Sequence, residues 1–127
     1  MIEPEVFHSN EQTLASNHYQ SENDDALSLD EIKKRALLEF DNLKSEIEKN
    51  DLKVTSMKGI EECPDHIFPN WFITFDDLTV QLFSMKAENR RLEKTPEMVD
   101  FLKEKYDLAG DLSSFEEKNM FLEATSS

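Results

Sequence analysis

The clearest hydrophobic pattern in the chain starts at residue 28 and has the spacing of an amphipathic α-helix. Ser28 stands three positions before Glu31, which is the capping-box pattern that starts a helix. Asn50 is a common residue at the carboxyl end of a helix. We therefore predict a helix over residues 28–50 whose apolar stripe packs in the core rather than against a partner. Apolar residues recur along it at steps of three and four, at Ile32, Ala36, Leu37, Phe40, Leu43 and Ile47.

Two runs of aromatic and β-branched residues, 71–75 and 79–83, predict a β-hairpin. The three residues between them end in Leu78. If Leu78 adopts a left-handed conformation there, this costs about 1 kcal/mol or more.

A second helix is predicted to start after Thr95, because Thr95 can cap it and Pro96 suits its first position. Its buried stripe is expected to comprise Met98, Val99, Leu102 and Tyr106.

Shorter runs predict strands near 6–7, at 52–55 and at 108–112, and a further strand that starts at 120–122. The order of helix, strand, hairpin, helix and strand indicates an α/β or α+β fold with mixed short strands and two main helices. Residues 1–27 are polar and have no clear period, so we expect an opening segment there and a single domain over 28–127.

The composition excludes several classes of function. The chain has 28 acidic and 14 basic residues, a net charge of -14, so nucleic acid and anionic membranes are poor partners. It contains no apolar run of roughly 18 residues that could span a membrane, and its acidic start is unlike a secretory signal. A single cysteine favours a reducing compartment, the cytoplasm. Two glycines are too few for a phosphate-binding loop.

Residues that could act as a nucleophile or hold a metal do not form a recognisable pattern. Cys63 lies beside Glu61 and Glu62, whose negative charges disfavour a reactive thiolate. We interpret Cys63 as structural or incidental. The spacing of His8, His18 and His66 does not match a zinc site, so no metal is expected.

Two motifs in the middle of the chain carry a family resemblance. Residues 64–72 read Pro-Asp-His-Ile-Phe-Pro-Asn-Trp-Phe, and residues 85–94 read Met-Lys-Ala-Glu-Asn-Arg-Arg-Leu-Glu-Lys. They resemble the arginine deiminase-related, amidinotransferase-like proteins that include citrulline hydrolases. In that family, Phe-Pro-Asn-Asn-Trp precedes a hairpin, and Tyr-Pro-Met then precedes Asn-Arg-Arg. The flanking pieces 10–17 and 111–123 match the family's opening loop and its approach to a Leu-Glu-Gly-Thr-Gly-Ser motif.

The resemblance implies a fold and a chemistry. The family's fold is similar to a five-bladed α/β propeller of ββαβ modules, of which this chain resembles the first and most of the second. In the family, a cysteine attacks the guanidino or ureido carbon and a histidine helps water to release the product. Both residues lie in later modules. The resemblance therefore implies no catalytic residue in this chain, and no metal or cofactor.

The resemblance also implies four substrate-binding residues: Asn70, Arg90, Arg91 and Glu123. Glu123 would hold the guanidino nitrogens, the two arginines would bind a substrate carboxylate, and Asn70 would line the pocket. Other roles fit the same residues: Asn70 as a turn residue beside a core Trp71, the arginines as partners of surface glutamates, and Glu123 as a solvated strand residue. Glu123 is expected to be poorly fixed, because it lies within the last five residues of the sequence.

Three classes of function remain. In the first, the chain is an amino-terminal fragment of a guanidino- or ureido-group hydrolase and is inactive alone. Alternatively, it is a subunit that completes its active site with a copy of itself or with a separately encoded carboxyl-terminal half. The third alternative is a non-catalytic, acidic binding module.

Overall fold

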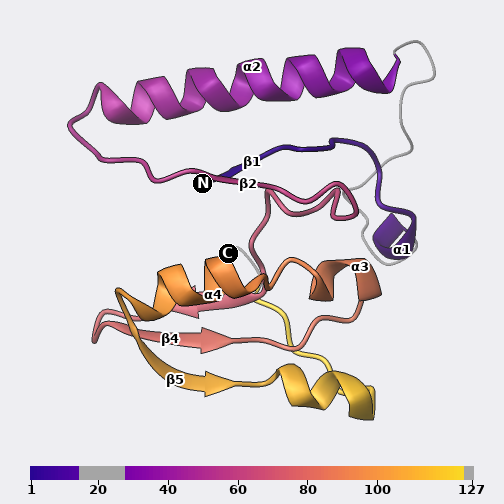
Figure 1. Ribbon diagram of the computed structural model, residues 1–127, viewed down its shortest axis with the longest axis vertical. Coiled ribbons are helices and arrows are strands. Elements are labelled where there is room, and N and C mark those ends of the chain that lie inside the picture. The colour runs from indigo at the N-terminus through magenta and orange to yellow at the C-terminus, as the bar shows by residue number, and fades with distance from the viewer. Residues whose placement is uncertain (15–27, 125–127) are drawn as a thin grey trace. The chain divides into compact units, whose positions relative to one another are not determined.

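The computed structural model describes residues 1–14 and 28–124, and its chain divides into two compact units (Figure 1). Unit 1 comprises Met1–Phe68 and unit 2 comprises Pro69–Ser127. The predicted match of Ser16 and Asn17 to the family's opening loop, together with His18 and the last three residues, lies outside the described residues. In the described ranges, no helix is long and apolar enough to cross a membrane.

Unit 1 is built from a pair of very short parallel strands and one long helix. Its elements are β1 (Ile2–Glu3), α1 (Glu11–Leu14), α2 (Leu29–Glu48) and β2 (Met57–Lys58). β1 pairs with β2, so that Ile2 lies opposite Met57. Since parallel strands need a long crossover, α2 belongs to the connection between them.

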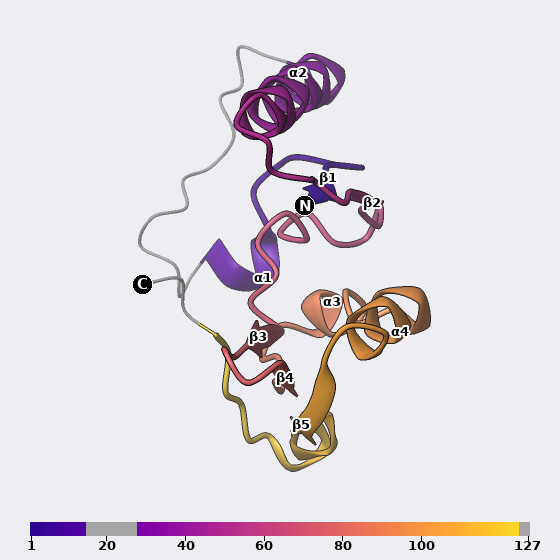
Figure 2. The same ribbon diagram turned by 90° about the vertical axis from the view of Figure 1, so that its left-hand side faces the viewer.

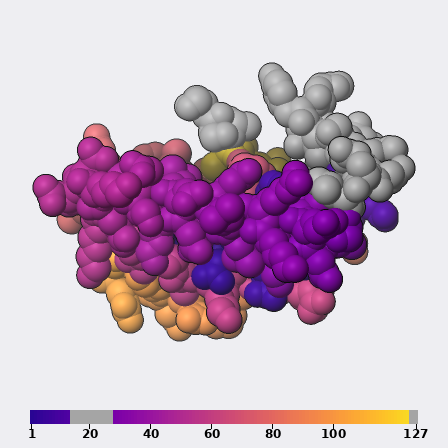
Figure 3. All heavy atoms as spheres, turned by 90° about the horizontal axis from the view of Figure 1, so that it is seen from above, coloured from indigo at the N-terminus to yellow at the C-terminus, as the bar shows by residue number. Residues whose placement is uncertain are grey.

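The helix predicted from residue 28 is confirmed. The Glu31 N–H donates to Ser28 Oγ at 3.3 Å, and the Ser28 N–H donates to Glu31 Oε2 at 3.0 Å, which completes the capping box. α2 ends at Glu48, two residues before the predicted stop. Its stripe is only partly in the core: Phe40 is buried, whereas Leu43 is 54% exposed. Side chains of α2 form a broad outer surface of unit 1 (Figure 3).

Two of the predicted short strands were wrong in position. The strands lie at β1 and β2 rather than at 6–7 and 52–55. Gly59 accounts for this register, because its N–H donates to Glu3 O at 2.9 Å and an added Cβ would lie 2.8 Å from that oxygen. The close approach aligns the residues just before Gly59 with β1. The predicted opening loop also contains α1.

Unit 2 is a β-β-α-β arrangement. Its elements are β3 (Phe72–Thr74), β4 (Thr79–Leu82), α3 (Glu88–Arg91), α4 (Pro96–Lys103), β5 (Asp107–Asp111) and the 3-10 helix η1 (Ser113–Lys118). The sheet order is β3-β4-β5; β3 and β4 are antiparallel, and β4 and β5 are parallel. α3 and α4 form the crossover, and α4 lies against one face of the sheet (Figures 1 and 2). The mixed α+β class is confirmed.

The predicted hairpin and second helix are confirmed. Leu78 has φ 60°, a left-handed conformation that costs a leucine about 1 kcal/mol or more. Thr95 Oγ1 accepts the Met98 N–H at 3.3 Å and caps α4. Met98 and Leu102 are buried, as are Val80 and Leu82 of β4. These side chains form the core between α4 and the sheet.

The predicted strand at 108–112 is β5, displaced by one residue. Within the described residues, the apolar run that starts at residue 120 makes one antiparallel bridge, between Ser84 and Leu122, and no longer strand.

Candidate functional site

Glu123 is held by the short segment that follows β4, residues 84–86, which we call the 84–86 loop. The Lys86 N–H donates to Glu123 Oε1 at 2.8 Å, and the Leu122 N–H donates to Ser84 O at 3.1 Å. Glu123 is half-buried. Its Oε2 accepts no hydrogen bond from the residues that the structure describes. The prediction that Glu123 is poorly fixed was therefore wrong, because main-chain bonds hold both it and its neighbour.

Asn70 links this end of the chain to the second motif. Its Nδ2 donates to Ala124 O at 2.6 Å, and its main-chain oxygen accepts the Ala124 N–H at 2.8 Å. Its Oδ1 accepts a hydrogen bond from Arg90 Nη2 at 3.1 Å. Trp71 is buried beside it. In this arrangement, both polar atoms of the Asn70 side chain hold the chain together.

Arg90 forms a buried ion pair with Glu93. Arg90 Nε donates to Glu93 Oε1 at 2.9 Å and Nη2 donates to Oε2 at 3.2 Å, a two-pronged geometry that suits a guanidinium and a carboxylate. The Glu93 side chain is 0% exposed and that of Arg90 is 9% exposed. A buried carboxylate of this kind needs a cation beside it, and Arg90 provides that charge.

Arg91 binds the main chain of the 84–86 loop. Its Nε donates to Met85 O at 2.9 Å and its Nη2 donates to Lys86 O at 3.1 Å. Its guanidinium carbon lies 5.5 Å from the centre of the Phe121 ring, a cation–π contact. In the described part of the chain, Nη1 donates no hydrogen bond, so Arg91 keeps one pair of donors for another group.

A second ion pair braces the same loop. Lys94 is paired with Glu116, and both side chains are largely buried. Glu116 Oε1 also accepts the Met85 N–H at 2.8 Å, while Lys94 Nζ donates to Phe83 O at 3.0 Å and Ser113 Oγ at 2.7 Å. The pair thus connects the end of β4 with η1.

The structure brings all four predicted residues to the 84–86 loop and its partners, and it adds three that sequence reasoning missed: Glu93, Lys94 and Glu116. The sequence gives a weak signal for Glu93 and Lys94, because Glu93 stands three positions after Arg90, a spacing at which side chains on a helical turn can pair. Glu116 carries none, because its partners lie more than twenty positions away. The roles of Asn70, Arg90, Arg91 and Glu123 toward a substrate stay predictions.

Cys63 and His66 belong to a separate cluster in unit 1. Both are buried, and the main-chain N–H of His66 donates to the main-chain oxygen of Cys63 at 3.1 Å within a turn. Asp65 accepts hydrogen bonds from Asn10 Nδ2 at 2.8 Å and Thr13 Oγ1 at 3.0 Å, which ties this turn to α1. Among residues 1–14 and 28–124, no group of three or more His, Cys, Asp or Glu side chains could hold a metal ion.

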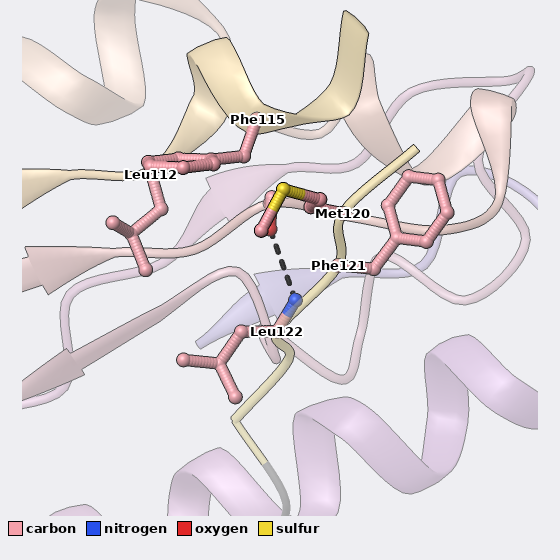
Figure 4. Close-up of a pocket in the computed structure, with 6 residues that line it drawn as sticks. Leu112, Phe115, Met120, Phe121 and Leu122 are labelled. Carbon is pink, nitrogen blue, oxygen red and sulfur yellow. Dashed lines mark hydrogen bonds between the residues drawn. The ribbon is translucent and has the colours of Figure 1, made fainter. Parts of the chain in front are cut away.

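An open apolar pocket of about 190 Å³ lies near the loop in unit 2 (Figure 4). Leu112 and Phe115 line one side, and Phe121 and Leu122 line the other. The Ser84 hydroxyl at its wall accepts the Leu122 N–H at 2.9 Å. The polar side chains described above do not line this pocket.

The motifs that build this loop belong to a class of proteins that modify guanidino groups, the amidinotransferase superfamily. A family model described as "N,N dimethylarginine dimethylhydrolase, eukaryotic" matches residues 3–127, and the chain belongs to this family. No curated protein and no solved structure gives a significant match. The resemblance found in the sequence is confirmed at the level of the superfamily.

Proposed function

We propose that this chain forms one side of a site that hydrolyses a guanidino or ureido group, and that it does not complete the reaction by itself. The observation that carries the proposal is the family match, which spans nearly all of the chain. By the family's description, the substrate class is N,N-dimethylarginine and related guanidino compounds. Hydrolysis of N,N-dimethylarginine by one water molecule would yield citrulline and dimethylamine.

Glu123 and Arg91 are the residues that we propose to contact the substrate. The Lys86 N–H fixes one carboxylate oxygen of Glu123 and leaves Oε2 for a guanidinium nitrogen. The main chain fixes two donors of Arg91 and leaves Nη1 for a substrate carboxylate. Both side chains are thus oriented before a ligand arrives, which lowers the entropy cost of binding.

We propose that Arg90 and Asn70 are structural. Arg90 uses its donors on Glu93 and Asn70, and its side chain is buried. Breaking this pair to bind a substrate would leave Glu93 as an uncompensated buried charge. The two adjacent arginines would therefore have different roles.

The proposed inactivity of the chain alone rests on its thiol chemistry. Cys63 is the single cysteine, and it is 2% exposed. Covalent attack on a guanidino carbon requires a thiolate that the substrate can reach, with a base within hydrogen-bond distance. Turnover would thus require further modules of a five-bladed propeller, to which unit 2 would contribute one β-β-α-β module. That remainder could be a separately encoded carboxyl-terminal half.

One titration tests both parts of the proposal. We would add N,N-dimethylarginine to the isotopically labelled chain and follow amide resonances and product formation by NMR in the same sample. We expect the Lys86 and Glu123 amides to shift with ligand concentration, because the ligand would bind Glu123 beside them. We expect no citrulline to form, since the single cysteine of the chain is buried.

The matched variants are Glu123→Gln, which removes the proposed ligand charge, and Glu97→Gln on the exposed side of α4. The first should abolish the shifts and the second should preserve them. Shifts that persist in Glu123→Gln would rule out the binding role. Citrulline formation that stops in Cys63→Ser would show that the chain is active alone.

A further inference from the structure

The apolar pocket in unit 2 has properties of a docking site for a protein segment. Met120 at its mouth is 54% exposed and Leu122 is 55% exposed, so two apolar side chains of the wall face solvent. Figure 4 shows Leu112 and Phe115 across the pocket from Phe121 and Leu122. Apolar surface exposed in this way marks interaction sites more often than chance, because water solvates it poorly.

The size and chemistry of the pocket favour one apolar side chain over a metabolite. Pockets for small organic ligands usually enclose roughly 300–1,000 Å³ and offer a few polar groups that orient the ligand. This pocket encloses about 190 Å³. Its one polar side chain, Ser84, already accepts a hydrogen bond from the Leu122 N–H. A buried anchor side chain at the centre of an interface suits such a pocket.

The charge around the pocket indicates which partner could bind. Residues 107–122 contain four acidic side chains and one basic side chain, Lys118, and Glu116, one of the four acids, is paired with Lys94. A cation rests on each aromatic side chain of the wall: the Lys118 ammonium lies 5.2 Å from the centre of the Phe115 ring, and the Arg91 guanidinium carbon lies 5.5 Å from that of Phe121. Asp107, Asp111 and Glu117 are exposed. With a net charge of -14, a second copy of the chain would be repelled, whereas a basic segment would be attracted.

The strand next to the pocket can accept another strand. β5 is the last strand of the β3-β4-β5 sheet, and within the described residues it has a strand neighbour on one side only. Leu112, which lines the pocket, directly follows β5. An extended segment that pairs with β5 would therefore lie close to the pocket, as in other complexes where a peptide adds a strand to a sheet edge.

We propose that β5 and this pocket bind an extended segment of another protein, with one large apolar side chain in the pocket and lysine or arginine on either side of it. The main chain of β5 would provide the pairing, and the net charge of -14 would favour lysine or arginine beside the anchor side chain. None of the residues that line the pocket is assigned to the guanidino compound, so this proposal does not rest on the proposed function.

The test is a binding titration of the full chain with a fluorescein-labelled peptide, Lys-Arg-Thr-Val-Phe-Val-Thr-Arg-Lys, followed by anisotropy. We expect saturable binding that weakens as salt is added, because the charges are exposed. A peptide with serine in place of the phenylalanine should bind at least about tenfold more weakly, as expected for an anchor residue. A peptide with glutamate in place of each basic residue should also bind more weakly.

Met120→Glu places a charge at the mouth of the pocket and should weaken binding about tenfold. Leu122→Glu makes the same test if Met120→Glu does not fold. Leu38→Glu is the control, because Leu38 is an exposed leucine on α2 of unit 1 that does not line the pocket, and it should leave the affinity unchanged.

Several outcomes would overturn the proposal. No saturable binding of the basic peptide would refute it, as would equal binding of the serine peptide. Self-association that rises with concentration and is lost in Met120→Glu would identify a second copy as the occupant instead. Displacement of the peptide by N,N-dimethylarginine would assign the pocket to the hydrolase site.

Discussion

Units 1 and 2 differ in how they are stabilised. Unit 1 contains the longest helix, α2, with 20 residues, but Phe40 is the single buried residue of that helix, and its strands have two residues each. Unit 2 has a helix of eight residues, yet α4 and the three-stranded sheet bury a shared core, and two ion pairs brace the connections. Long regular structure and a well-packed core thus occur in different parts of this molecule.

This difference shows which interactions fix a site. The capping box of α2 and the stripe of apolar residues determine a helix locally, but they do not position other segments. The 84–86 loop has no regular structure, and its geometry comes from side chains that donate to or accept from its main chain. We therefore expect the stability of unit 2 to depend on a few buried polar residues, and that of unit 1 on helix formation.

The largest effect is expected from Glu93→Ala, which would leave the Arg90 guanidinium buried without its carboxylate. Removing one partner of a buried ion pair costs about 3–5 kcal/mol of unfolding free energy. Trp71 is the single tryptophan and is buried in unit 2, so urea unfolding followed by its fluorescence measures this change. Glu97→Ala, at an exposed position of α4, is the control and should change stability by less than about 0.5 kcal/mol. A loss below about 1 kcal/mol in Glu93→Ala would mean that water replaces the carboxylate.

A smaller effect is expected from Phe40→Ala in α2. Truncation of a fully buried phenylalanine costs roughly 3–5 kcal/mol, but the rest of this stripe is only partly buried, so we expect about 2–3 kcal/mol. Far-ultraviolet circular dichroism follows this loss, because α2 contributes most of the helical residues. Leu38→Ala, an exposed position, is the matched control. If the Trp71 fluorescence transition shifted by the same amount, the two units would unfold as one, and the contrast between them would not hold.

The sequence predicted those elements whose determinants are adjacent in the chain. α2, the hairpin and α4 follow from caps, proline placement and periodicity. β1 and β2 were misplaced because a contact between Gly59 and Glu3 sets their register. For the site, the motifs identified Asn70, Arg90, Arg91 and Glu123 but not their partners. Whether Arg90 binds a substrate or a glutamate depends on a side-chain geometry that a motif does not specify.

The smallest effect that still distinguishes the units is expected from Ser28→Ala at the start of α2. The cap contributes about 1 kcal/mol, so the helix signal of unit 1 should melt earlier while Trp71 fluorescence is unchanged.

Hydrogen bonds from the Ser28 N–H and then from its hydroxyl hold the pKa of Glu31 below its ordinary value of 4.5. A lowered pKa in the folded state means that this contribution is present above pH 4.5 and is lost as the pH falls below it through the folded pKa. The helix signal of the wild type should therefore fall more steeply on acidification than that of Glu31→Gln, which removes the titrating carboxylate, whereas Ser28→Ala keeps the main-chain N–H that is the larger cause of the shift. Ser45→Ala, within α2, should retain the wild-type pH profile, and identical profiles for Glu31→Gln and wild type would show that the capping box does not control this end of the helix.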